Sequence, residues 1–166
     1  SEDPTKPVGR HRRARTFPLN RAVFLDRDGV INQAIVREGR PYAPIKLEQF
    51  EVLPGVPEAI KSLRLAGFKI IVVTNQPDVA TGAQRREVVE TMLQRLGAMG
   101  LCDDIKVCYH TDANICDCCK PKPGMLIEAA LEWDVNLTDS FMVGDRWRDV
   151  AAGKAADRFT YFIDYK

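Results

Sequence analysis

The amino-acid sequence predicts an α/β fold: a doubly wound, Rossmann-like parallel sheet of about five strands, with helices between the strands. Five short apolar runs recur along the chain, and amphipathic or alanine-rich stretches separate them. The runs are apolar throughout, which is typical of strands buried on both faces in a parallel sheet. The length of 166 residues suits one domain with a real hydrophobic core.

Each element follows from its own residues. Strands are expected where the apolar runs stand, at 22–25, 69–73, 105–109, 140–143 and 159–163. Helices are expected at 56–65, 84–96, 123–133 and 149–156. Pro123 suits the first turn of its helix. The stretch 32–53 fits neither the periodicity of a helix nor that of a strand. Because it follows the first strand, it would overhang the carboxyl edge of the sheet, and long loops in such places tend to be functional.

The charge is unevenly placed along the chain. Residues 1–20 lack periodicity, so we expect a flexible basic extension there, either solvated or used as a partner-binding arm, and a folded domain over 21–166. The first 21 residues carry a net charge of +4, whereas the rest carries −3. A mildly acidic folded part argues against a nucleic-acid binder. No run approaches a membrane span and no segment resembles a secretory signal, so a cytoplasmic monomer is expected.

Acidic and hydroxyl side chains follow three of the expected strands. The three segments are Asp26-Arg27-Asp28-Gly29, Thr74-Asn75-Gln76 and Gly144-Asp145-Arg146-Trp147-Arg148-Asp149. The carboxyl ends of parallel strands meet at one edge of the sheet, where open α/β sheets bind ligands. Converging carboxylates repel one another unless a cation lies between them, and oxygen ligands suit Mg²⁺. A magnesium site that also receives a substrate phosphate is therefore expected at this edge.

The Asp-x-Asp-Gly segment permits a specific reaction. A carboxylate beside the metal can attack phosphorus and form an aspartyl-phosphate. A carboxylate two residues later can protonate the leaving oxygen and then activate water. The glycine allows a sharp turn beside the ligand.

A group of cysteines with one histidine occupies the segment 108–119. Thiolates and an imidazole are the ligands of tetrahedral Zn²⁺, and Cys₃His is a common structural set. In a chain without a secretory signal, we interpret the five cysteines as thiols and not as disulfides. Cys102 stands apart and is expected to be a packed thiol.

Four segments together resemble the haloacid dehalogenase superfamily of phosphatases. They are AVFLDRDGVIN (22–32), VVTNQ (72–76), CCKPKPGM (118–125) and MVGDRWRD (142–149). The resemblance covers residues 22 to about 164 and is strongest to subgroup IIIA, which contains heptose-bisphosphate and histidinol-phosphate phosphatases. It implies a catalytic core without a cap domain, and the chain has no insertion large enough for one.

The resemblance assigns roles at the strand ends. It implies that Asp26 is the nucleophile and Asp28 the general acid/base. Thr74, together with Asn75, matches the group that binds the transferring phosphoryl oxygens. Lys120 matches the lysine that neutralises developing charge.

The resemblance also implies the metal ligands. Mg²⁺ would be held by Asp26, Asp145 and the backbone carbonyl of Asp28. Arg146 is expected to contact a substrate phosphate. Asp149 is either part of the site or only a carboxylate at the start of a helix.

The resemblance implies a structural zinc loop that pins Lys120. Its expected ligands are Cys108, His110, Cys116 and Cys118. This sequence departs from the family at two positions where relatives often have arginine, Cys119 and Thr81. Arg37, Arg40 and Lys46 are either substitutes for those cations or solvated loop charges. Trp147 either borders the substrate or packs.

These features predict a Mg²⁺-dependent phosphomonoesterase that acts on a small phosphorylated substrate, most of all a sugar phosphate such as D-glycero-D-manno-heptose 1,7-bisphosphate. Histidinol phosphate is the alternative substrate. A non-hydrolytic phospho-aspartyl signalling domain is the alternative from another class, although it gives Asp28 and the zinc loop no role. A non-catalytic zinc-binding relative is disfavoured by the retained Asp26, Lys120 and Asp145.

Overall fold

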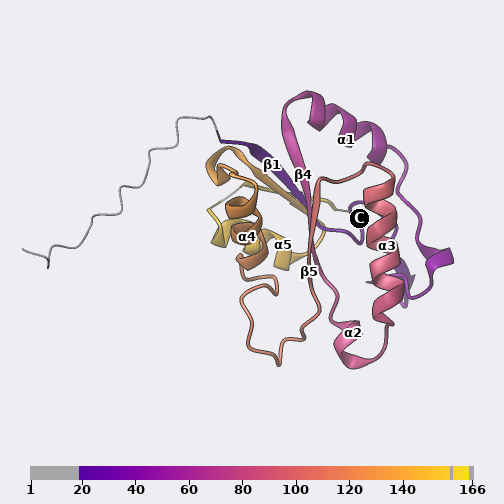
Figure 1. Cartoon of the computed structure of the whole chain (residues 1–166). Coiled ribbons are helices and arrows are strands. Elements are labelled where there is room, and N and C mark those ends of the chain that lie inside the picture. The colour runs from indigo at the N-terminus through magenta and orange to yellow at the C-terminus, as the bar shows by residue number, and fades with distance from the viewer. Residues whose placement is uncertain (1–18, 158, 165–166) are drawn as a thin grey trace, which may run out of the picture.

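The structure is a computed structural model that describes residues 19–157 and 159–164. A parallel sheet forms its centre, with the strand order β5-β4-β1-β6-β7 (Figure 1). The strands are β1 (Arg21–Leu25), β4 (Phe68–Asn75), β5 (Asp104–Cys108), β6 (Phe141–Gly144) and β7 (Phe159–Phe162). All four neighbouring pairs are parallel, which confirms the predicted five-stranded, doubly wound sheet.

Helices cover both faces of the sheet. Helices α1 (Val56–Leu65) and α3 (Arg86–Ala98) lie on one side, and α4 (Gly124–Glu132) and α5 (Trp147–Ala155) on the other (Figure 1). The alternation of side chains along β1 explains this. Val23 and Leu25 pack in the core that α1 and α3 close, whereas Ala22 and Phe24 pack in the core that includes α4.

The segment 32–53, which the periodicity left unassigned, contains short elements. Strands β2 (Ile35–Arg37) and β3 (Arg40–Tyr42) form an antiparallel hairpin, and a 3₁₀ turn, η1 (Leu47–Gln49), follows. The sequence also gave no sign of α2 (Asp78–Thr81) or η2 (Leu137–Asp139). Elements of three or four mostly exposed residues bury too little to leave a hydrophobic period.

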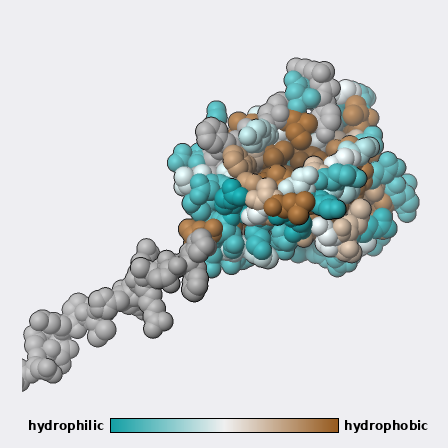
Figure 2. Space-filling view, turned by 90° about the horizontal axis from the view of Figure 1, so that it is seen from above, coloured by the Kyte–Doolittle hydropathy of each residue, from teal (hydrophilic) through white to brown (hydrophobic). Residues whose placement is uncertain are grey.

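The sheet has two different ends. Helix α2 and the loop after β5 lie at the carboxyl ends of the strands, at the bottom of Figure 1. The view from above shows the other end, where apolar residues gather in a central area edged by hydrophilic ones (Figure 2). In the described part of the chain, no helix is long and apolar enough to cross a membrane.

The expected extension 1–20 lies outside the described residues except for Leu19 and Asn20. The backbone N–H of Asn20 donates to the carbonyl of Asp134 (2.9 Å), and its carbonyl accepts from the N–H of Asn136 (2.8 Å). Residue 20 is therefore attached to the loop before η2.

Candidate active site

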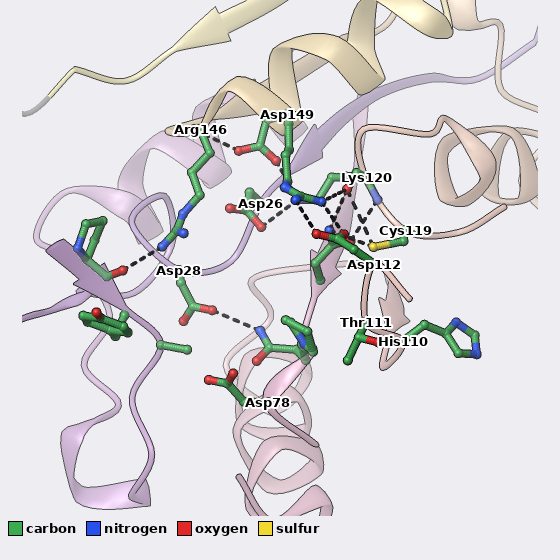
Figure 3. A pocket seen from close by; sticks show the side chains of 17 residues that line it. Asp26, Asp28, Asp78, His110, Thr111, Asp112, Cys119, Lys120, Arg146 and Asp149 are labelled. Atoms are coloured by element: carbon green, nitrogen blue, oxygen red, sulfur yellow. Dashed lines mark hydrogen bonds and ion pairs between the residues drawn. The ribbon is translucent and has the colours of Figure 1, made fainter. Parts of the chain in front are cut away.

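A cavity of about 400 Å³ opens at the carboxyl edge of the sheet (Figure 3). Its walls come from the loops after β1, β4, β5 and β6 and from the β2–β3 hairpin. Seven of the candidate residues from the sequence line it: Asp26, Asp28, Asn75, His110, Lys120, Arg146 and Asp149. The topology therefore brings together side chains that are far apart in the sequence.

Lys120 is the centre of the charge arrangement. Its side chain is 3% exposed, and Nζ lies 2.8 Å from Asp26 Oδ1, 2.6 Å from Asp149 Oδ1 and 2.9 Å from the carbonyl oxygen of Val73. An ammonium group has three N–H donors, and each has an acceptor here. Burial alone would lower the pKa of Lys120, but the two carboxylates outweigh burial and raise it, so the ammonium stays charged.

Asp26 follows β1 directly, and its backbone N–H donates to the carbonyl of Val143 in β6 (3.0 Å). Burial raises the pKa of its carboxyl group to about 6; Lys120 opposes this rise, and the nearby Asp149 adds to it. Above neutral pH the group is still ionised. A buried carboxylate with a shifted pKa that faces a cavity is a candidate functional group.

The geometry around Asp145 fits a divalent cation. Oxygen atoms of Asp26, Asp145 and Asp149 lie within 4.8 Å of one another. Asp145 Oδ1 is buried and has no hydrogen-bond partner in the described part of the chain. A Cβ at Gly29 would stand 2.1 Å from Asp145 Oδ2, so only glycine leaves room for this carboxylate. Clustered acidic oxygens with one orphaned atom match the hard ligand set of Mg²⁺.

Asp149 resolves an alternative that the sequence left open. It lies in the first turn of α5, where its Oδ2 accepts from the backbone N–H of Arg146 (3.1 Å), and its Oδ1 pairs with Lys120. A Cβ at Gly144 would stand 2.1 Å from the Cβ of Asp149, so the close approach of α5 to β6 needs glycine there. Asp149 is therefore both a helix-start carboxylate and part of the charge arrangement.

Asp28 is held by a separate buried network. Arg27 is fully buried and donates to both oxygens of Asp28 from Nη2, at 2.9 and 3.0 Å, and to Oδ1 from Nε at 3.1 Å. Asn32 Nδ2 donates to Oδ1 (2.9 Å), and Gln76 Nε2 donates to Oδ2 (3.0 Å). These five hydrogen bonds fix the carboxylate at the cavity wall, and its side chain is not part of the acidic cluster at Asp145.

The two polar residues at the end of β4 have different surroundings. Thr74 is fully buried behind the cavity lining, and its hydroxyl oxygen accepts from Gln76 Nε2 (2.9 Å), which leaves the hydroxyl hydrogen for an acceptor. Asn75 lines the cavity, but both ends of its amide bind the backbone of Lys120: Nδ2 donates to the carbonyl (3.0 Å) and Oδ1 accepts from the N–H (3.0 Å). Asn75 therefore positions Lys120.

The predicted cations of the site differ in where they lie. Arg146 lines the cavity, and its Nη2 donates to the carbonyl of Pro41 in the hairpin (3.1 Å). Arg37, Arg40 and Lys46 are exposed and do not line this cavity. They are therefore not substitutes for the missing arginines in this arrangement. Trp147 is also outside the lining, and 64% of it is exposed.

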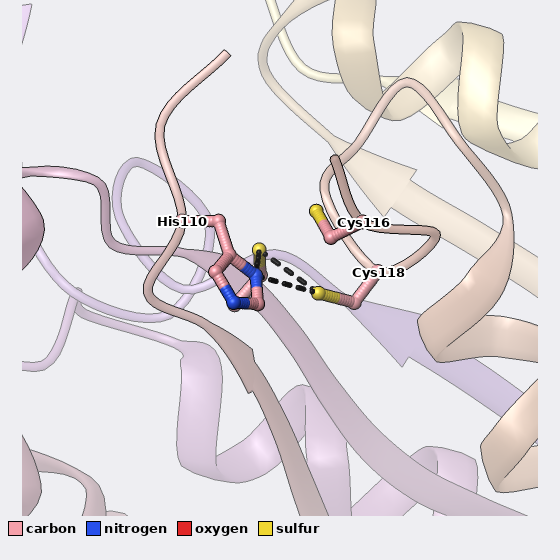
Figure 4. A group of neighbouring side chains, drawn as sticks. His110, Cys116 and Cys118 are labelled. Atoms are coloured by element: carbon pink, nitrogen blue, oxygen red, sulfur yellow. Dashed lines mark hydrogen bonds between the residues drawn. The ribbon is translucent and has the colours of Figure 1, made fainter. Parts of the chain in front are cut away.

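The predicted zinc ligands lie together beside the cavity (Figure 4). Donor atoms of Cys108, His110, Cys116 and Cys118 are all within 4.8 Å of one another. His110 Nδ1 lies 3.5 Å from the Sγ of Cys108 and 3.3 Å from that of Cys118. Three sulfur atoms and one imidazole form the Cys₃His set that suits tetrahedral Zn²⁺. Cys119 points to a different neighbour, because its Sγ accepts from Asn75 Nδ2 (3.4 Å).

Sequence reasoning missed three polar residues of the site. Arg27 and Gln76 stand inside the recognised motifs, so their position was the available signal, but burial cannot be read from a motif. Arg148 comes three residues after Asp145 and lines the cavity. Spacing alone did not distinguish it from a solvated charge.

The fold and the acidic cluster at the carboxyl edge define a class of enzyme. A family model described as haloacid dehalogenase-like hydrolase matches residues 19–157. The chain belongs to this family, which confirms the resemblance drawn from the motifs.

Particular relatives narrow the comparison. The chain is 37% identical over 149 residues to a D-glycero-beta-D-manno-heptose-1,7-bisphosphate 7-phosphatase of Pasteurella multocida, over 83% of this chain and 78% of the relative. It is 36% identical over 148 residues to the enzyme of that name from Escherichia coli K12, over 82% of this chain and 74% of the relative. The crystal structure of the D,D-heptose 1,7-bisphosphate phosphatase from B. bronchiseptica, complexed with magnesium and phosphate, superposes with a TM-score of 0.73 at 31% identity, over 86% of this chain and 79% of that one.

Proposed function

We propose that this chain is a Mg²⁺-dependent phosphomonoesterase that removes the 7-phosphate from D-glycero-D-manno-heptose 1,7-bisphosphate through an aspartyl-phosphate. The observation that carries the proposal is the contact between a buried lysine, Lys120, and a cavity-facing carboxylate, Asp26, which belongs to the carboxylate cluster with Asp145 and Asp149. The named relatives support the choice of substrate.

Asp26 is the nucleophile in this proposal. One of its carboxylate oxygens attacks the phosphorus atom of the monoester, a P–O bond to the enzyme forms, and the P–O bond to the sugar oxygen breaks. Lys120 offsets the negative charge on Asp26 and on the phosphoryl group as they approach, since Nζ lies 2.8 Å from Asp26 Oδ1. Thr74 supplies a hydroxyl hydrogen at the same edge.

Asp28 is the general acid and base. In the first step its protonated carboxyl group gives a proton to the leaving sugar oxygen. In the second step its carboxylate takes a proton from the water that attacks the aspartyl-phosphate, which returns Asp26 as a free carboxylate and releases inorganic phosphate. The hydrogen bonds from Arg27, Asn32 and Gln76 fix the position of this carboxyl group at the cavity wall.

Asp26, Asp145 and the backbone carbonyl of Asp28 would hold the Mg²⁺ ion. When bound, Mg²⁺ would neutralise the converging carboxylates and stabilise the negative charge of the phosphoryl group. The buried Oδ1 of Asp145 supports this ligand set, because it has no hydrogen-bond partner among the described residues and only a 4.0 Å ion pair with Arg146 Nε.

Zn²⁺ would be structural and held by Cys108, His110, Cys116 and Cys118. Only Cys119 stands between the last of these ligands, Cys118, and Lys120, so a fixed loop fixes the lysine backbone. The hydrogen bonds between Asn75 and Lys120 hold the same segment from the opposite side.

The test is phosphate release by the Asp26→Asn variant, which is isosteric but has no anionic oxygen for attack. We expect its turnover of the heptose bisphosphate to fall at least about 10³-fold, with a cooperative melting transition that shows the fold is retained. Asp139→Asn, the same substitution at an exposed carboxylate outside the cavity, is the matched control. Retained turnover in Asp26→Asn would exclude the nucleophile assignment. Faster hydrolysis of histidinol phosphate than of the heptose bisphosphate by the wild type would exclude the substrate.

A further inference from the structure

Two arginine side chains in the cavity are not used by the reaction steps above. Arg146 and Arg148, at the start of α5, line it together with Lys120, and these three are the lysine and arginine side chains among its described lining residues. Lys120 already has an acceptor for each of its N–H donors. A substrate anion other than the transferring phosphoryl group would therefore meet the arginines.

Arg148 is oriented toward the cavity by a backbone carbonyl and an aromatic ring. Its Nη1 donates to the backbone carbonyl of Lys120 (3.1 Å), and its guanidinium carbon lies 5.1 Å from the centre of the Trp147 ring. Lys120 in turn contacts the nucleophile, Asp26. Lys120 thus links Arg148 to Asp26, and Arg148 lies at the edge of the reacting centre.

The remaining partner of Arg148 is a carboxylate in the geometry that a phosphate also adopts. Asp112 accepts from Nη1 and Nη2 at 2.8 and 2.7 Å, a two-pronged pairing typical of guanidinium with carboxylate or phosphate. The Asp112 side chain is 70% exposed, against 31% for Arg148. Exposed ion pairs of this kind contribute little stability, so the carboxylate is readily displaced.

We propose that Arg148 binds a second anionic group of the substrate, which takes the place of the Asp112 carboxylate. This inference rests on the proposed function, and it adds the residue that selects a bisphosphate over a monophosphate. A phosphomonoester carries a charge of about −2 near neutral pH and three acceptor oxygens, so it competes well against one exposed carboxylate. The guanidinium of Arg148 is a cation that reaches the cavity from α5 and lies beside the Lys120 backbone. The residue before Lys120, Cys119, also lines the cavity but carries a thiol instead of a cation.

The experiment compares two substrates with the full chain loaded with Zn²⁺ and Mg²⁺. The measured quantity is the ratio of kcat/KM for D-glycero-D-manno-heptose 1,7-bisphosphate to kcat/KM for p-nitrophenyl phosphate. We expect Arg148→Gln to lower this ratio about 10- to 100-fold, the range for a lost charge-assisted pair. We expect Asp112→Asn to lower KM for the bisphosphate about two- to fivefold, because its competitor is gone. Arg95→Gln, on the exposed side of α3 and outside the cavity, is the matched control.

Each result decides the inference. A ratio within twofold of wild type in Arg148→Gln, or a parallel loss with both substrates, would assign Arg148 only to support of the Lys120 backbone. A higher KM in Asp112→Asn would mean that Asp112 assists the anion site. If the wild type does not hydrolyse the bisphosphate, the proposed function fails separately. Arg148 is then judged by inhibition of p-nitrophenyl phosphate hydrolysis: Arg148→Gln must weaken fructose 1,6-bisphosphate more than inorganic phosphate, and equal weakening overturns the inference.

Discussion

The substitution Asp149→Asn isolates one interaction of the site. The Asp149 side chain is 2% exposed; Oδ1 lies 2.6 Å from Lys120 Nζ, and Oδ2 accepts from the backbone N–H of Arg146. Asparagine retains an amide oxygen for the N–H at the start of α5. It removes the negative charge beside the ammonium and presents an NH₂ group instead. The substitution therefore changes the charge and keeps the helix cap.

The size of the effect follows from what remains around Lys120. A buried hydrogen bond to a charged group contributes about 1.5–3 kcal/mol, and full loss of one member of a buried pair costs about 3–5 kcal/mol. Because Asp26 and the carbonyl of Val73 still hold Lys120, we expect a loss of about 2 kcal/mol in the free energy of unfolding. For a chain of this length, that loss lowers Tm by about 4–8 °C. If the transition state of the reaction loses the same 2 kcal/mol of stabilisation, kcat falls about 30-fold.

The assay combines thermal melting with phosphate release across a range of Mg²⁺ concentrations. Asp149→Ala should lose about 1 kcal/mol more than Asp149→Asn, because alanine also removes the cap. Excess Mg²⁺ should not restore kcat in Asp149→Asn, since the lost partner is the ammonium of Lys120. Recovery of wild-type kcat at high Mg²⁺ would refute this reasoning and make Asp149 a metal ligand. A Tm within 1 °C and a kcat within twofold of wild type would refute it as well.

Two further predictions concern the zinc loop and pH. Elemental analysis should show that Cys118→Ser lowers bound zinc from about one per chain to a small fraction, and its kcat should fall with a smaller change in KM. The control, Cys102→Ser, should retain its zinc. Full zinc in Cys118→Ser would exclude this ligand set. Burial raises the pKa of Asp103, but the hydrogen bonds from the N–H of Ile70 and the guanidinium of Arg64 outweigh burial, so the pKa is lowered in the folded state. Its stabilising contribution is therefore present above the unfolded pKa of about 4 and lost as pH falls through the lowered folded value. Denaturant unfolding should show Asp103→Asn about 1 kcal/mol less stable than wild type at pH 7, with little difference at pH 2.5; an equal gap at both pH values would contradict the assignment.

The sheet and the acidic strand ends were predictable because their signals are local. A parallel strand buried on both faces leaves a continuous apolar run, and the residue after the run lies at the carboxyl edge. This places Asp26 after β1 and Asp145 after β6, and β1 and β6 are neighbours in the sheet. The cluster of three cysteines and one histidine was predictable for the same reason, because all four residues lie within one short segment.

The partners of Lys120 were not predictable from spacing. Asp149 is 29 residues further along the chain, and the carbonyl of Val73 is 47 residues before it. Their meeting depends on the path of the loop after β5, where the side chain of Asn75 at the end of β4 binds the backbone of Lys120. Arg27 was missed for a different reason. Arginine is rarely buried in proteins, and no sequence pattern marks this one as buried. The carboxylate of Asp28 offsets the charge of Arg27, and Gln76 Oε1 and the Phe50 ring also contact its guanidinium.

The walls of the cavity explain how a core without a cap domain can enclose a phosphorylated substrate. In the described part of the chain, the β2–β3 hairpin forms one wall through Pro41 and Tyr42, and Arg146 ties it to α5 through the Pro41 carbonyl. The loop after β5 forms the facing wall through Asp112, which Arg148 ties to the same helix. Both walls are thus fastened to the first turn of α5, the turn that also presents Asp149 to Lys120. A substrate group that displaces Asp112 would therefore release one wall at the point where the anion binds, so selection of the substrate and the shape of the cavity depend on the same few hydrogen bonds.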